Sequence, residues 1–76
     1  MTLDKIPSGR PARVVALEGS TRVTLRLMEM GIVPGAPIRL IKSAPLGDPI
    51  QVCVRGYHLA LRVADAQEIK VTLQGE

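Results

Sequence analysis

The chain has 76 residues, which is the size of one small domain and leaves no room for an enzyme with a separate substrate domain. Hydrophobic residues make up 46% of it without any Phe or Trp, so an aliphatic core is expected and disorder is excluded. Its single cysteine excludes a disulfide framework, and its net charge of +3 favours an acidic partner without identifying one.

The first part of the chain predicts a short N-terminal segment, a strand and a helix. Pro7, Gly9 and Pro11 separate the N-terminal segment from a β-like run at Ala12–Leu17. The next stretch alternates apolar and polar residues as a strand does, but it also shows helical spacing. We predict a helix there, because Ser20 can cap its start and Gly31 can adopt the left-handed conformation at its end.

The second part predicts four further strands. Residues 33–35 form a turn, in which Pro and Gly stand in the order that a type II turn requires. The strands are residues 36–43, 50–55, 57–62 and 69–73, with a hairpin turn at Gly56 and one helical turn at residues 64–67. Five short antiparallel strands in so small a chain would bury their apolar face by curling into a partly open barrel. The predicted fold class is therefore mainly β.

Catalytic groups are sparse in this sequence. It contains one histidine, one cysteine and seven acidic residues that show no paired pattern, so we predict that the protein is not an enzyme. The basic residues are scattered and one tyrosine offers no stacking platform, which argues against nucleic-acid binding. No apolar run is long enough for a membrane span or a signal peptide, so a cytoplasmic location is expected.

Cys53 and His58 are the candidate metal ligands. They face each other across the predicted hairpin if it turns at residues 55–56, and they are diagonal neighbours if it turns at residues 56–57. Either way they share the face opposite Ile50, Val52 and Val54, which we expect to be the outer, solvated face. A stable site requires three or four ligands, so we predict no bound cofactor and keep a metal site only as an alternative.

The predicted helix carries two apolar stripes. Val23, Leu27 and Met30 cluster on one side, whereas Leu25, Met28 and Ile32 cluster on nearly the opposite side. A helix on the outside of a small barrel buries one stripe. The second is either covered by Leu3 and Ile6 of the N-terminal segment or left available to another protein. In the latter case Leu25, Arg26, Met28 and Glu29 are the predicted partner-binding residues.

Several segments of the chain carry a family resemblance when they are read together. The most specific are the Met-Gly-Ile-Val-Pro-Gly block at residues 30–35 and the Ala-Pro-Leu-Gly-Asp-Pro block at residues 44–49. Segments 26–29, 54–56, 59–62 and 66–71 continue the series, which leaves out the first ten and the last three residues. In register and over most of its length, the chain resembles the FeoA family of accessory proteins in bacterial ferrous iron uptake.

This resemblance implies a single SH3-like domain over residues 1–76. It also implies a cytoplasmic partner or regulator of FeoB, the ferrous iron permease, that contacts its cytosolic portion and reaches the membrane only through it. No reaction of its own is expected, and self-association stays open. The alternative function is a metal-responsive sensor that binds a transition metal ion directly through Cys53 and His58, for which the family pattern gives no support.

Overall fold

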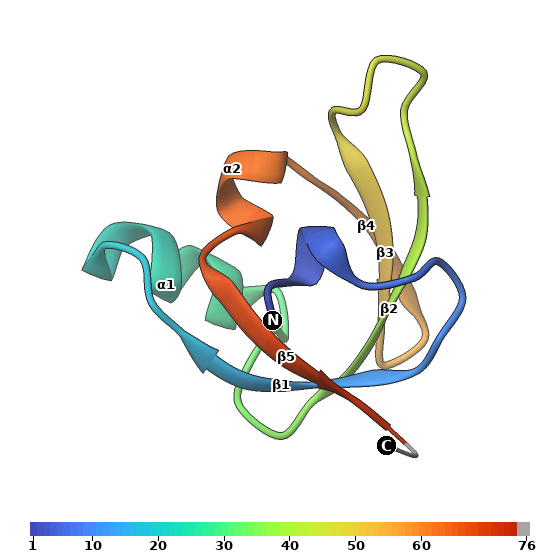
Figure 1. Ribbon diagram of the computed structural model, residues 1–76. Coiled ribbons are helices and arrows are strands. Elements are labelled where there is room, and N and C mark those ends of the chain that lie inside the picture. The colour runs from blue at the N-terminus through green and yellow to red at the C-terminus, as the bar shows by residue number, and fades with distance from the viewer. Residues whose placement is uncertain (75–76) are drawn as a thin grey trace.

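The computed structural model describes residues 1–74 and confirms a mainly β fold. Its five strands form one antiparallel sheet in the order β4-β3-β2-β1-β5, and this sheet curls (Figure 1). The buried apolar side chains pack together in one core. The elements are η1 (Leu3–Lys5), β1 (Ala12–Leu17), α1 (Thr21–Glu29), β2 (Pro37–Ser43), β3 (Ile50–Val54), β4 (Tyr57–Leu61), α2 (Val63–Ala66) and β5 (Ile69–Leu73). The predicted helix, the helical turn and all five strands are thereby confirmed, whereas the helical turn η1 was not predicted.

Two irregularities bend the sheet. The register between β1 and β5 shifts between Val14 and Ala16, and the register between β2 and β3 shifts between Leu40 and Lys42. Each shift inserts one extra residue into a strand, namely Val15 and Ile41, which increases the local twist and bend. These two bulges therefore allow a sheet of short strands to curl around the core.

Both predicted caps of α1 are present. The Ser20 hydroxyl accepts a hydrogen bond from the Val23 N–H at 3.3 Å, and Gly31 has a φ of 93°. After Glu29 the chain reverses, with Gly31 N–H donating to Met28 C=O and Ile32 N–H donating to Leu27 C=O. This pair of bonds is the Schellman arrangement, which brings the residue after the glycine back against the last turn of the helix.

The reversal at Gly31 corrects two helix assignments. Ile32 was predicted to lie on the outward stripe with Leu25 and Met28, but it is fully buried beside Leu27 in the core. Met30 was predicted on the inward stripe, but it is 37% exposed. Both errors have one cause: the regular helical spacing ends at Glu29, so positions 30 and 32 no longer follow it.

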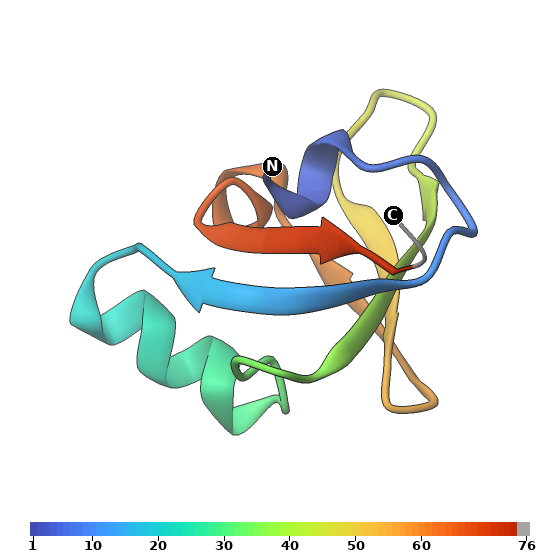
Figure 2. The ribbon, with the colours of Figure 1, turned by 60° about the horizontal axis from the view of Figure 1, so that its bottom comes forward.

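The N-terminal segment closes the core on a side away from α1. Leu3 and Ile6 are buried, and η1 contacts α2 and β5. Figure 2 shows η1 above β5 while α1 lies below β1. Leu25 and Met28 remain exposed, so of the two predicted possibilities the one in which the N-terminal segment covers the outer helix stripe is wrong.

The core position of Leu27 gives a direct test of this packing. Replacing a fully buried leucine with alanine leaves a cavity in the aliphatic core, so Leu27→Ala should lower the free energy of unfolding by about 2–5 kcal/mol. Leu25→Ala is the matched control on the same helix, and it should change that free energy by less than about 1 kcal/mol because its side chain is exposed. Urea unfolding followed by circular dichroism measures both values, and equal losses in the two variants would contradict the orientation of α1.

Candidate functional site

The outward side of α1 presents two apolar side chains. Leu25 is 55% exposed and Met28 is 43% exposed, and residues three apart on a helix are neighbours on its surface. Glu29 and Arg26 are exposed beside them. We call Leu25, Arg26, Met28 and Glu29 the outer α1 face. The structure thus brings together the four residues predicted to bind a partner, on a helix whose other side is fixed in the core by Leu27.

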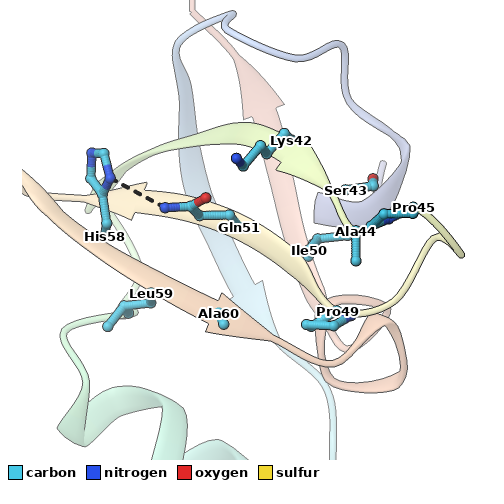
Figure 3. Close-up of a pocket in the computed structure, with 10 residues that line it drawn as sticks. All are labelled: Lys42, Ser43, Ala44, Pro45, Pro49, Ile50, Gln51, His58, Leu59 and Ala60. Atoms are coloured by element: carbon cyan, nitrogen blue, oxygen red, sulfur yellow. Dashed lines mark hydrogen bonds between the residues drawn. The ribbon is translucent and has the colours of Figure 1, made fainter.

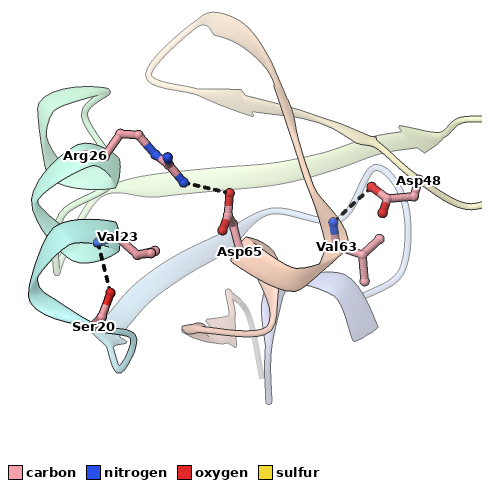
Figure 4. Close-up of polar contacts among 6 residues, drawn as sticks. All are labelled: Ser20, Val23, Arg26, Asp48, Val63 and Asp65. Carbon is pink, nitrogen blue, oxygen red and sulfur yellow. Dashed lines mark hydrogen bonds and ion pairs between the residues drawn. The ribbon is translucent and has the colours of Figure 1, made fainter.

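Arg26 also has a contact within the chain. Its Nη2 lies 3.2 Å from Oδ2 of Asp65, the acidic residue of α2 (Figure 4). The Arg26 side chain is still 56% exposed, whereas that of Asp65 is 18% exposed. The ion pair therefore connects the two helices and leaves part of the guanidinium accessible. Asp65 was not predicted as a partner, because the two residues lie 39 positions apart in sequence and no local pattern relates them.

A second long-range contact holds the start of α2. Asp48, in the loop between β2 and β3, accepts a hydrogen bond from the Val63 N–H through Oδ1 at 3.1 Å (Figure 4). The first N–H groups of a helix lack partners within it, so a carboxylate from another loop takes that role here. The sequence alone predicts only a loop at residues 45–49, without this contact.

The outer face of β2, β3 and β4 holds the candidate metal ligands. The hairpin turns at Arg55–Gly56, with φ values of 51° and 87°, so Cys53 and His58 face each other directly. Their placement on one face is confirmed. The prediction that Cys53 is solvated is wrong, since it is buried with 9% exposure. It lies on the interior strand β3, between Arg39 of β2 and His58 of β4, whose larger side chains flank it.

The surroundings of this pair favour neither ligand for a metal. One histidine ring nitrogen, Nδ1, lies 3.4 Å from Nε2 of Gln51, so His58 has a polar neighbour on the same face. Within residues 1–74 no group of three or more His, Cys, Asp or Glu side chains lies close enough together to hold a metal ion. Cys53 and His58 thus supply two donors, fewer than a stable site requires.

A surface pocket of about 630 Å³ lies near the same strands (Figure 3). Its walls come from the end of β2, the loop that follows it, the start of β3, and β4. The lining residues are Lys42, Ser43, Ala44, Pro45, Pro49, Ile50, Gln51, His58, Leu59 and Ala60. Most of them are apolar and none is acidic. This pocket could not be predicted from the sequence, because it forms from segments that only the sheet pairing brings together.

The helices do not provide a membrane span. In residues 1–74 none of them combines the length and the apolar character that crossing a bilayer requires.

Comparison with known proteins relates the whole described chain to one family. The FeoA domain matches residues 1–73. The match includes the first ten residues, which the motif comparison left out and whose Leu3 and Ile6 belong to the core. The chain is also 37% identical over 73 residues to an Fe(2+) transport protein A/Fe(2+) transporter FeoB fusion protein of Porphyromonas gingivalis. That alignment covers 96% of this chain and 9% of the fusion protein.

Solved structures agree with this relationship. Iron(II) transport protein A from Clostridium thermocellum is 39% identical with a TM-score of 0.93, and the match covers 99% of this chain and 46% of that one. FeoA of Stenotrophomonas maltophilia, described as an SH3 domain protein complexed with zinc, is 31% identical with a TM-score of 0.81 over 93% of this chain and 88% of that one. The chain thus spans less than half the length of the Clostridium protein and a small part of the fusion protein. In sequence and in fold, this chain belongs to the FeoA domain family.

Proposed function

We propose that this chain is a cytoplasmic accessory protein of bacterial ferrous iron uptake and that it binds the cytosolic portion of a FeoB-type permease. Membership of the FeoA family supports the pathway. The Porphyromonas relative is described as FeoA and FeoB joined in one polypeptide. Such a link holds two modules at high effective concentration, which favours even a weak contact between them.

The observation that carries the proposal is the outer α1 face. A helix in a small domain usually turns its apolar side chains inward, but here Leu25 and Met28 point outward while Leu27 packs in the core. Burial of Leu25 and Met28 would provide affinity, and the adjacent Arg26 and Glu29 would orient the partner through complementary charges. Methionine suits such a contact because its unbranched side chain adapts to the opposing surface.

The proposed activity is binding and regulation without catalysis. Among the described residues, Glu29 of α1 is exposed to solvent, and Asp65 of α2 forms an ion pair with Arg26. His58 and Cys53 lie on a different part of the domain, on β4 and β3. The chain would therefore influence transport through the contact it makes with the permease.

Met28→Glu tests this contact. A charge at the centre of the outer α1 face would have to be desolvated on binding, so the affinity for the cytosolic portion of the permease should fall by at least about tenfold. Because Met28 is exposed, the thermal midpoint should move by less than about 4 °C. Calorimetric titration and thermal unfolding measure the two quantities.

Leu46→Glu is the matched control for this experiment. Leu46 is 97% exposed in the loop between β2 and β3, so it places the same charge on an apolar surface position away from α1. Its affinity should equal that of the unmodified chain. Equal weakening by both variants, or a large fall in the midpoint for Met28→Glu alone, would remove the support for the outer α1 face as the contact.

A metal-responsive sensor is the second candidate, and the zinc complex of the Stenotrophomonas protein is the observation that favours it. With two donors at Cys53 and His58, we expect the isolated chain to bind zinc more weakly than a site with three or four ligands does. Calorimetric titration with zinc chloride measures this directly. Tight binding at one ion per chain, abolished in Cys53→Ser, would favour the sensor instead.

A further inference from the structure

One edge of the sheet carries backbone groups without partners. The hairpin has a two-residue turn, so its closing pair, Val54 and Tyr57, exchanges hydrogen bonds, and alternate pairs beyond it do the same. The pairs that contain His58 and Ala60 are the non-hydrogen-bonded ones. The N–H and C=O groups of His58 and Ala60 therefore point away from β3, toward the free edge of β4. Within residues 1–74, no backbone bond outside the strand ladders reaches them.

The opposite edge of the sheet is treated differently. Along β5, the Val71 N–H donates to the Met1 C=O at 2.8 Å, and Thr2 forms a bridge with Lys70. The N-terminal segment thus covers β5, whereas β4 stays bare in the part of the chain that the structure describes. A bare edge strand is a template for an additional strand. Until such a strand binds, water molecules form hydrogen bonds with the free N–H and C=O groups of the edge.

The pocket of about 630 Å³ borders this edge. His58, Leu59 and Ala60 of β4 line it on one side, while Pro45 and Pro49 line it at the loop end (Figure 3). Its volume is in the range of sites that hold side chains or small ligands. A strand added to β4 would place side chains beside this pocket at every second residue, because successive side chains point to opposite faces.

The charges around the edge are mainly positive. Residues 36–62, which form β2, β3, β4 and their connections, contain four Lys or Arg residues, Arg39, Lys42, Arg55 and Arg62, against one acidic residue, Asp48. Asp48 is already bonded to the Val63 N–H. The ion pairs among the described residues use Lys5, Arg26 and Lys70, and none uses the four cations of this region. The region is therefore complementary to a negatively charged partner.

We propose that the free edge of β4 and the pocket beside it bind an extended acidic peptide segment of a partner protein as an added strand. Main-chain hydrogen bonds with His58 and Ala60 provide the pairing, apolar side chains of the peptide face the pocket, and its carboxylates are attracted by the positive charges of Arg62 and, at longer range, Lys42. A single-stranded nucleic acid would use the same charges, but Tyr57 is the only aromatic residue of the chain and bases require a stacking surface. The proposal uses other residues than the outer α1 face and does not depend on the function proposed above.

The test uses the synthetic eight-residue peptide Glu-Thr-Val-Thr-Glu-Thr-Val-Thr, whose glutamate and valine side chains all lie on one face of the strand, added to the ¹⁵N-labelled full chain. We expect the amide signals of His58 and Ala60 to shift and their hydrogen exchange to slow by at least about tenfold at saturation. The same peptide with every amide N-methylated cannot donate hydrogen bonds, and it should lose the effect without any change to the protein. Unchanged His58 and Ala60 signals with the parent peptide would overturn the proposal.

Protein variants separate the pairing from the charge. Ala60→Pro removes an N–H that faces the free edge and leaves the bonds to β3 intact, so binding should weaken by at least about tenfold. Lys42→Glu should weaken it too, whereas Lys5→Glu makes the same change of charge outside the region and should not. If Ala60→Pro fails to fold, the two lysine variants test the role of charge and the N-methylated peptide tests the main-chain pairing. Equal binding of a peptide with lysine in place of glutamate, or tighter binding of an oligothymidylate, would overturn the proposal.

Discussion

The packing of Leu27 and Ile32 into the same aliphatic core is the interaction on which the rest of this structure depends. The two residues come together because the chain reverses at Gly31, where a φ of 93° suits glycine and strains other residues. With both side chains buried, the rotation of α1 about its axis is fixed. The outward position of Leu25 and Met28 follows from this packing, because residues on the far side of a fixed helix have no inward alternative.

Two polar contacts fix how α1, α2 and the loop after β2 are oriented relative to one another. Arg26 joins α1 to α2 through Asp65, and Asp48 joins the loop after β2 to the start of α2 through the Val63 N–H. An exposed ion pair such as Arg26–Asp65 contributes little stability, typically about 0–1 kcal/mol, which is less than the buried leucine and isoleucine contribute. The effect of the two polar contacts is geometric, since the first contact fixes α2 relative to α1 and the second fixes the loop after β2 relative to α2.

Much of the fold could be predicted from the sequence because its signals are local. The Ser20 cap, the Gly31 cap, the turn at residues 33–35 and the hairpin at Gly56 each depend on residues a few positions apart, and the structure confirms them. The burial of Cys53 depends instead on which strands flank β3, and the partner of Arg26 comes from a distant helix. The free edge of β4 likewise becomes visible only once the strand order is known.

The bare edge of β4 also bears on how copies of this domain meet one another. An exposed edge strand can pair with the same strand of another copy, and such pairing leads to fibres or precipitates in many β proteins. Here an antiparallel match between two β4 strands would bring the end that carries Arg55 on one copy close to the end that carries Arg62 on the other. Electrostatic repulsion between these guanidinium groups opposes this pairing, whereas a negatively charged strand is not repelled. The positive charges at the two ends of β4 thus disfavour association of this edge with the same edge of another copy.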